Sequence, residues 1–390
     1  MKKRTIYLNN AATTWPKPGC VVDALLRATR ELAGTPGRAV TRDLECERAI
    51  FRAREAAARF IGASDSSRVI FTPNATAALN LAITGLLKKG DHVVTTSMDH
   101  NSVARPLRRA EEEKGVEVQR FDLSPAGTMK AEGVVKMITS HTRLVVLTEA
   151  SNVTGSIQPV GDIAGAVRAM GGDRPLILVD AAQSAGVLPM NVEKDGVDLL
   201  AVPGHKSLYG PQGTGFLYIA PGVSLTPLLE GGTGGHSGQE RQPESLPDRF
   251  ESGTPNTPGI VALGEALKFL AERGLEEIRA EEIRLMDILT DGISGIRGVE
   301  LFGPRDPRER VGVLSFNVEG MDPAEVGTFL ETTRGIILRV GLHCSPHSHR
   351  TIGTFPEGTV RISPGIFNTD EEIIELIQGV KDLQRARGIL

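Results

Sequence analysis

The sequence predicts an α/β protein with a larger domain, built on a mostly parallel seven-stranded sheet, and a smaller α+β domain. From about residue 68, seven short apolar segments alternate with segments of helical periodicity, which is the order of elements in a layered α/β fold. Residues 176–179 are apolar at every position. Continuous apolar strands are typical of parallel sheets buried on both faces.

The seven expected strands cover residues 68–72, 92–96, 116–122, 143–150, 176–180, 199–202 and 214–220. Between the first two strands we expect a helix at residues 75–87. There Leu79, Ile83 and Leu86 recur at helical spacing, and Gly90 closes the unit. The succession of strand, helix and strand predicts parallel pairing across the sheet.

The alternation stops at residues 221–258, which contain the run Gly231-Gly232-Thr233-Gly234-Gly235 and several prolines. We expect a long loop here, and long loops in compact folds are usually functional. The elements expected after it are helices at 258–273 and 275–293 and strands near 311–318, 336–341 and 359–363. A last helix should begin at a capping box formed by Thr369 and Glu372.

These elements divide the chain into two expected domains. The larger one should comprise residues 16–257, and the smaller one residues 1–15 together with 258–390.

Composition excludes several classes of function. The 390 residues hold 44 Lys and Arg against 48 Asp and Glu, a net charge of −4 without blocks of one sign, which argues against nucleic acid or an anionic membrane as partner. The apolar stretch at the start ends at Asn9, too early for a signal peptide, and no run approaches a membrane span. Three widely spaced cysteines fit a reducing compartment. We therefore expect a cytoplasmic protein.

Ligands of open α/β sheets bind beyond the carboxyl ends of the strands. After the first strand come Pro73-Asn74-Ala75-Thr76, with Asn74 placed to cap a helix and Ala75 and Thr76 in its first turn. Free backbone N–H groups, the helix dipole and the Thr76 hydroxyl would suit a phosphate. An ordinary capped helix start explains the same residues.

Asp180 ends the strand at 176–180, where a buried carboxylate is costly unless a cation or several donors meet it. A protonated pyridine nitrogen would meet it, and so would the backbone amides of the next turn. Lys206 follows the strand at 199–202, in Gly204-His205-Lys206. A desolvated lysine amine forms Schiff bases, although most lysines are merely solvated surface residues.

Together these sites supply a phosphate cradle, a carboxylate for a ring nitrogen and a lysine that could hold an aldehyde carbon. Pyridoxal 5'-phosphate needs all three. The glycine-rich run at 210–215 does not predict a dinucleotide site, because it precedes a strand and not a helix.

Over nearly its whole length the sequence resembles the class V aminotransferase-type, fold-type I pyridoxal-phosphate enzymes, and within them the cysteine desulfurases. The stretches that carry the resemblance are residues 7–14 (Tyr-Leu-Asn-Asn-Ala-Ala-Thr-Thr), 99–100 (Asp-His), 151–155 (Ser-Asn-Val-Thr-Gly), 180–183 (Asp-Ala-Ala-Gln), 204–206 (Gly-His-Lys), 253–256 (Gly-Thr-Pro-Asn) and 339–344 (Arg-Val-Gly-Leu-His-Cys).

The resemblance implies a role for each matching residue. Lys206 would hold the cofactor, Asp180 its ring nitrogen and Gln183 its ring oxygen. His100 would stack on the ring and act in catalysis. Ala75, Thr76 and His205 would bind the phosphate, and Thr254 would reach the phosphate of a partner subunit, which implies a homodimer. Asn152 and Arg361 would hold the carboxylate of an amino-acid substrate.

Cys344 matches the sulfur-accepting cysteine of the second group of desulfurases, the branch that includes selenocysteine lyase-like members. The resemblance implies that its thiolate takes sulfur from L-cysteine, leaving alanine and an enzyme persulfide, which a sulfur-acceptor protein would then use. A thiolate near an imidazole such as His343 is chemically reasonable. The alternatives are a selenocysteine lyase, another reaction on a cysteine-like amino acid, and a relay protein with little turnover.

Several residues depart from the family pattern. Asn9 stands where the family usually has Asp, Gly37 where a histidine often precedes Arg38, and Pro203 where a hydroxyl residue often helps to hold phosphate. Ser207 is an additional residue before residues 208–210. These departures suggest a divergent subfamily.

The segment that carries Cys344 permits a second interpretation. Cys344, His343, His347 and His349 lie within seven residues and could ligate a transition metal. Their spacing matches none of the familiar zinc patterns, so we expect no metal.

Overall fold

The computed structural model describes residues 5–388, except 38–39, 125–126 and 236. Its larger part contains one seven-stranded sheet. In sheet order the strands are β2 (Val69–Thr72), β8 (Gly215–Ile219), β7 (Leu199–Pro203), β6 (Leu176–Asp180), β5 (Thr142–Thr148), β3 (His92–Thr96) and β4 (Glu117–Phe121). Only β8 runs antiparallel to its neighbours within the described chain. The mostly parallel sheet predicted from the sequence is thus confirmed.

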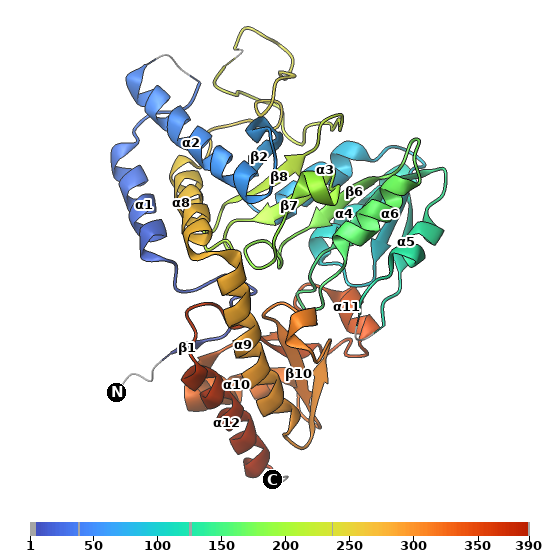
Figure 1. Cartoon of the computed structure of the whole chain (residues 1–390), viewed down its shortest axis with the longest axis vertical. Coiled ribbons are helices and arrows are strands. Elements are labelled where there is room, and N and C mark those ends of the chain that lie inside the picture. Colours follow the sequence, from blue (N-terminus) through green and yellow to red (C-terminus); the bar gives the residue numbers. More distant parts are fainter. Residues whose placement is uncertain (1–4, 38–39, 125–126, 236, 389–390) are drawn as a thin grey trace.

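Helices cover both faces of this sheet (Figure 1). They are α1 (Gly19–Glu31), α2 (Thr41–Phe60), α3 (Ala75–Leu86), α4 (Asn101–Lys114), α5 (Ala131–Met137), α6 (Val160–Ala169), the short α7 (Val192–Asp195) and α8 (Thr257–Arg273). Side chains of β5 alternate between the two cores: Val145 and Leu147 pack toward α2 and α6, whereas Leu144 and Val146 pack toward α3 and α4. The middle of this strand, buried on both faces, is therefore apolar at every position from Leu144 to Leu147.

The smaller part is an antiparallel sheet packed on helices (Figure 1). Its strands are β12 (Arg339–Gly341), β13 (Thr359–Ile362), β10 (Leu314–Val318) and β9 (Val299–Phe302), and its helices are α9 (Leu275–Ser294), α10 (Pro323–Arg334), α11 (Pro346–Thr351) and α12 (Asp370–Ala386). Near the chain start, β1 (Ile6–Tyr7) pairs in parallel with β11 (Ile336–Ile337). The capping box of α12 forms as expected, with Glu372 accepting from the Thr369 N–H at 3.4 Å.

Some expected elements differ from the structure. Neither β9 nor α10 was predicted, and the strand expected from residue 311 starts only at Leu314. The reason is that Val311 and Val313 pack in a separate small core with Ala11 and Val187, between the two parts. The segment expected at 336–341 is divided between β11 and β12, which belong to different sheets.

The position of α8 bears on the domain boundary expected at residues 257–258. This helix packs along α1 and α2, and its Leu263 and Leu267 belong to the core of the larger sheet. The following helix, α9, places Leu285 and Leu289 in the smaller core. We therefore propose a boundary near Gly274, between the two helices.

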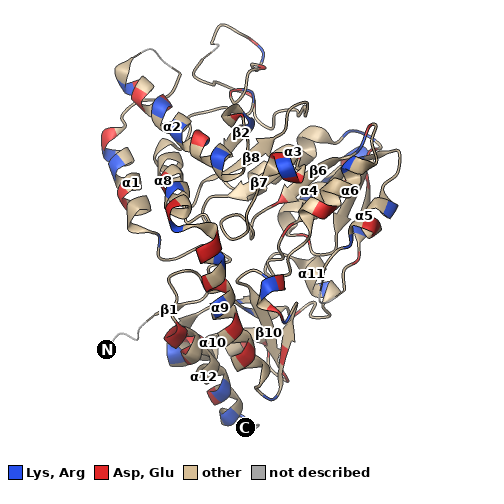
Figure 2. Ribbon diagram, viewed as in Figure 1, with Lys and Arg blue, Asp and Glu red and all other residues tan. Residues whose placement is uncertain are grey.

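Charged residues of both signs occur along α2 and α12 (Figure 2). In the described part of the chain, no helix combines the length and low polarity that crossing a bilayer requires.

Candidate active site

Nine of the predicted site residues line one cavity of about 200 Å³: Ala75, Thr76, His100, Asn152, Asp180, Gln183, His205, Lys206 and Arg361. They come from the carboxyl ends of the parallel strands, where ligand sites of such sheets lie, and from β13 of the smaller part. Two predicted residues lie outside the cavity lining. Thr254 is exposed in the long loop after β8, and Cys344 is exposed beside the site.

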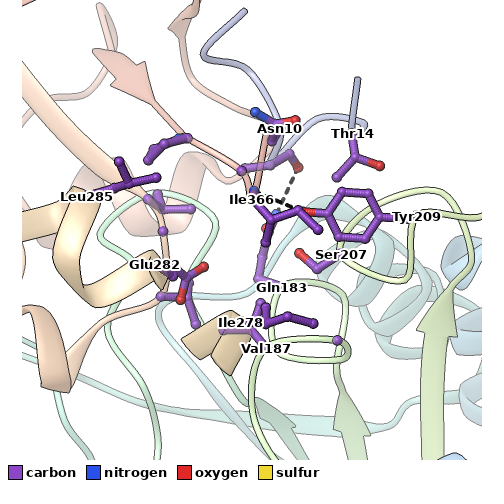
Figure 3. A pocket seen from close by; sticks show the side chains of 17 residues that line it. Asn10, Thr14, Gln183, Val187, Ser207, Tyr209, Ile278, Glu282, Leu285 and Ile366 are labelled. Atoms are coloured by element: carbon purple, nitrogen blue, oxygen red, sulfur yellow. Dashed lines mark hydrogen bonds between the residues drawn. The ribbon is translucent and has the colours of Figure 1, made fainter. Parts of the chain in front are cut away.

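A second, smaller cavity lies between the two parts of the molecule (Figure 3). It is lined by Asn10, Tyr209 and Glu282 among others, and Gln183 borders both cavities. Its volume of about 30 Å³ has room for roughly one or two water molecules. The larger cavity is therefore the candidate site for a cofactor.

The start of α3 has the free donors expected of a phosphate cradle. The Asn74 side chain accepts the Ala77 N–H at 2.9 Å, so the first two N–H groups of the helix stay available. The Thr76 hydroxyl lies 2.8 Å from the Ser102 hydroxyl. Opposite them, His205 Nδ1 is buried without a hydrogen-bond partner in the described structure. A buried polar atom without a partner is costly, and an oxygen or a hydroxyl group of a bound anion would supply a hydrogen-bond partner for His205 Nδ1.

His100 is held in one orientation at the start of α4. It caps the helix, because its Nδ1 accepts the Ser102 N–H at 3.0 Å. Burial, followed by the positive charges of Lys206 and Arg339, lowers the pKa of His100 to about 3. The ring is therefore neutral at physiological pH. Since Nδ1 is the acceptor, the ring proton is on Nε2.

Asp180 and Lys206 are oppositely charged groups that line the same cavity, the first buried and the second partly buried. Burial lowers the pKa of Lys206 to about 8, while the charge of Asp180 acts in the other direction. Burial raises the pKa of Asp180, opposed by Lys206 and by the Ala182 N–H, which donates to its carboxylate at 2.9 Å. A cationic ring nitrogen beside the second carboxylate oxygen would compensate the buried charge.

Arg361 is a guanidinium with only 1% of its surface exposed. It donates to the Asn152 carbonyl at 3.0 Å and to Asn9 Oδ1 at 3.2 Å, and its Nε has no partner in the described structure. Burial, followed by the nearby positive charge of Arg339, lowers its pKa to about 9. A buried cation bonded only to neutral groups favours an anionic ligand.

The loop that carries Cys344 is held in a strained backbone conformation. His343 and Cys344 have φ values of 49° and 61°, in the left-handed region that residues with a Cβ rarely adopt. The Asn101 N–H donates to the Cys344 carbonyl at 2.8 Å. Arg339 Nη2 lies 3.3 Å from Cys344 Sγ. The strain thus presents the thiol beside a guanidinium.

Asn152 connects this loop to Arg361 in the cavity. Its side-chain Nδ2 donates to the His343 carbonyl at 2.7 Å, and its Oδ1 accepts from Ser345 Oγ at 2.7 Å. Its own carbonyl accepts from Arg361. The resemblance implies that Asn152 binds a carboxylate directly, whereas most of its polar atoms here contact the Cys344 loop and Arg361.

Comparisons with known proteins identify the family. The model of the aminotransferase class-V family matches residues 6–376. The chain belongs to this family. A probable cysteine desulfurase from Methanothermobacter thermautotrophicus is 37% identical over 94% of this chain and 92% of its own length. One from Halalkalibacterium halodurans is 34% identical over 98% of this chain and 94% of its own.

The fold agrees with this assignment to the aminotransferase class-V family. A cysteine desulfurase from Thermococcus onnurineus, solved without its ligand, has a TM-score of 0.90 at 31% identity and covers 98% of this chain and 95% of its own. The fold class and the family predicted from the sequence are confirmed. The prediction that the protein is an enzyme of this class is confirmed as well.

Sequence reasoning missed three residues of this class V site. Arg339 lies in a quoted motif but was given no role, Ser102 joins Thr76 to His100, and Lys17 contacts the backbone before Lys206. The Lys17 ammonium donates to the His205 carbonyl at 2.8 Å. The spacing of Ser102 two residues after His100 at a helix start was the only local signal for Ser102. The other contacts join distant segments.

The metal interpretation of the Cys344 segment is not supported. In the described residues no three His, Cys, Asp or Glu side chains are grouped to hold a metal. His343 Nε2 instead lies 3.0 Å from the Thr359 hydroxyl, and His349 Nδ1 lies 2.7 Å from the Thr354 hydroxyl.

Proposed function

We propose that the protein is a pyridoxal-phosphate-dependent cysteine desulfurase that converts L-cysteine to L-alanine and keeps the sulfur as a persulfide on Cys344. The observation that carries the proposal is the single cavity that unites Lys206, Asp180 and Arg361 beside an exposed thiol. The relatives named above as cysteine desulfurases support it over nearly the full chain.

The residues present fit the cofactor. His205 Nδ1 and the start of α3 would meet its phosphate, Asp180 its ring nitrogen and Lys206 its aldehyde carbon. Gln183 donates to the Ala11 carbonyl at 3.1 Å, which fixes its side chain at the cavity wall for a ring oxygen. When bound, pyridoxal phosphate supplies an electron sink that stabilises negative charge on the substrate's α-carbon.

The chain's own residues then do the following. Arg361 binds the substrate carboxylate through two prongs. Lys206 Nζ, whose pKa of about 8 makes it an effective base near neutral pH, takes the α-proton. The Cys344 thiolate attacks the substrate sulfur, so that a sulfur–sulfur bond forms as the carbon–sulfur bond breaks. The carbon keeps the bonding pair, gains a proton and becomes the methyl group of alanine.

Cys344→Ser tests this proposal. A serine hydroxyl is a poor nucleophile toward sulfur, so alanine production from L-cysteine should fall at least about 100-fold, while cofactor absorbance stays unchanged. Alanine and sulfide are measured together, with L-cysteine and L-selenocysteine as parallel substrates. Undiminished alanine from L-cysteine in the variant would favour another reaction on a cysteine-like amino acid. Turnover confined to L-selenocysteine would indicate a selenocysteine lyase. A cofactor-loaded wild type without turnover would indicate a relay protein.

We also propose a homodimer in the cytoplasm. Leu44 and Phe51 form an apolar stripe on the outer side of α2, and Leu229 of the long loop is 69% exposed. Thr254 is exposed in the same loop, as a residue that reaches across a subunit interface would be. The three cysteines are all free thiols, which fits a reducing compartment. Light scattering should report a dimer for the wild type and a smaller species for Phe51→Glu.

A further inference from the structure

Three arginines lie on the elements next to Cys344, and we call them the basic rim: Arg105 of α4, Arg339 of β12 and Arg350 of α11. Arg339 contacts the thiol at 3.3 Å. Arg350 is exposed on α11, which begins two residues after Cys344, and its guanidinium stacks on the Phe355 ring at 4.3 Å. Arg105 is exposed on α4, one turn beyond Asn101, whose N–H binds the Cys344 carbonyl.

The positive charge of the rim is not compensated by carboxylates. In the described part of the chain, none of the three arginines forms an ion pair, whereas neighbouring Arg108 on the same helix pairs with Glu111 and Glu112. His347, which precedes Arg350 on α11 by three residues, supports this description. Its pKa is lowered by burial and then by the positive charges of Arg120 and Arg350, with no negative charge acting on it.

We propose that the thiol which takes sulfur from Cys344 is anionic, carrying carboxylates close to its sulfur. The inference rests on the proposed function, because it concerns the second half of that reaction. The acceptor thiolate attacks the outer sulfur of the Cys344 persulfide. A new sulfur–sulfur bond forms on the acceptor, the bond at Cys344 breaks, and Cys344 leaves as a thiolate, so no further oxidant or reductant is needed.

The physical reason is electrostatic selection at an exposed thiol. A region of one sign concentrates ligands of the opposite sign and raises their rate of encounter on the order of tenfold or more at low ionic strength. The rim would also favour the thiolate form of an approaching acceptor over the thiol. Cationic thiols should be repelled by the same field.

The experiment uses the holoenzyme, loaded from L-cysteine carrying radiolabelled sulfur and then freed of substrate. Three small acceptors are compared at equal concentration: mercaptosuccinate (anionic), 2-mercaptoethanol (neutral) and cysteamine (cationic). Each transfer rate is divided by the rate of the same thiol with the free persulfide of cysteine, which removes intrinsic reactivity. Short cysteine peptides flanked by Asp or by Lys form a second set, which separates a small-molecule acceptor from a polypeptide one.

We expect mercaptosuccinate to accept sulfur on the order of tenfold faster than cysteamine at ~0.02 M salt, and the difference to disappear at ~0.5 M. Arg105→Glu and Arg350→Glu should each reduce the preference while still forming the persulfide. Arg143→Glu is the matched control, because this exposed residue lies at the amino end of β5, away from the site. It should leave the preference unchanged.

The outcomes separate the two proposals. If no persulfide forms on Cys344, the proposed function fails. If the persulfide forms but all acceptors, small thiols and peptides alike, react in proportion to intrinsic reactivity, the anionic acceptor is wrong. A preference for cysteamine also overturns the proposal of an anionic acceptor. So does a preference for mercaptosuccinate that Arg143→Glu abolishes as fully as Arg105→Glu and Arg350→Glu do. A preference shown only by the peptides supports the proposal with a polypeptide acceptor.

Discussion

Buried charge at single residues determines what the cavity binds. Asp180 and Arg361 are almost completely buried, and Lys206 is partly buried. Of the three, only Asp180 is an anion, and its charge acts on Lys206. Arg361 is bonded to the neutral amide of Asn9, where the family pattern has an aspartate. The guanidinium is therefore not neutralised by the protein and can pair fully with a substrate carboxylate.

Asp180→Asn should reduce desulfuration on the order of 100-fold. In the proposed function the carboxylate would keep a cofactor ring nitrogen protonated, and an amide could not compensate that charge. The amount of cofactor bound per protein and the rate of alanine production are measured on the same sample, so that loss of binding and loss of rate are distinguished. Turnover close to wild type would show that Asp180 has only a structural role through the Ala182 N–H.

Lys206 should react with the cofactor in a characteristic pH range. Only the free amine attacks an aldehyde, and burial lowers the pKa of Lys206 to about 8. The rate at which the apoprotein takes up pyridoxal phosphate should therefore rise with pH and level off above about pH 8. Stopped-flow absorbance follows the reaction. A rate that still rises at the ordinary lysine pKa of about 10.4 would contradict the buried amine.

At the scale of elements, the loop between β12 and α11 is the least regular part of the site. Its two residues with positive φ are stabilised from outside the loop, by Asn101 of α4 and by Asn152 after β5. Two residues of the larger part, Asn101 and Asn152, therefore determine where the Cys344 thiol of the smaller part lies. Such strain persists only where surrounding contacts hold it.

Asn152→Ala should release this loop. The variant loses the hydrogen bonds to the His343 carbonyl and to Ser345 Oγ, which together stabilise the loop by roughly 1–3 kcal/mol. Persulfide formation should fall about tenfold or more, as that free energy predicts, while the bound cofactor keeps its absorbance. Thr333→Ala, an exposed residue on α10, is the control. An Asn152→Ala enzyme with normal persulfide formation would refute the positioning role.

The elements differ in how far the sequence predicted them. The strands of the larger sheet and the Asn74 cap follow from local patterns, so their positions agree with the structure to within two residues. The division of 336–341 between two sheets depends on pairing of β11 with β1, more than 300 residues earlier. The contact of Arg339 with Cys344 likewise requires the loop strain, which no local pattern reveals.

At the scale of the whole molecule, the N-terminal segment joins the two halves of the site. Asn10 donates to the Ser363 carbonyl of the smaller part at 3.1 Å, and the Ala11 carbonyl accepts from Gln183 of the larger part. Thr14 donates to the carbonyls of His205 and Lys206. The sequence pattern placed this segment with the smaller domain; the contacts show it touching both.

A buried ion pair holds the long loop that bears Thr254. Arg54 of α2 donates to both Glu251 oxygens, at 2.6 and 2.8 Å, and Glu251 accepts the Phe71 N–H of β2. Arg54→Met leaves the Glu251 carboxylate without its partner and should lower the free energy of unfolding by about 3 kcal/mol. Urea unfolding measures this, with Arg143→Met as control. A change below about 0.5 kcal/mol would show that the pair does not anchor the loop.

The central claim is that Cys344 receives sulfur from L-cysteine, and the most direct measurement is mass spectrometry of the protein after incubation with L-cysteine and alkylation. The account predicts one additional sulfur atom on the peptide that contains Cys344, none on those containing Cys20 or Cys46, and none in Lys206→Ala. Sulfur on either of the other cysteines, or an unmodified Cys344 in an enzyme that produces alanine, would contradict it.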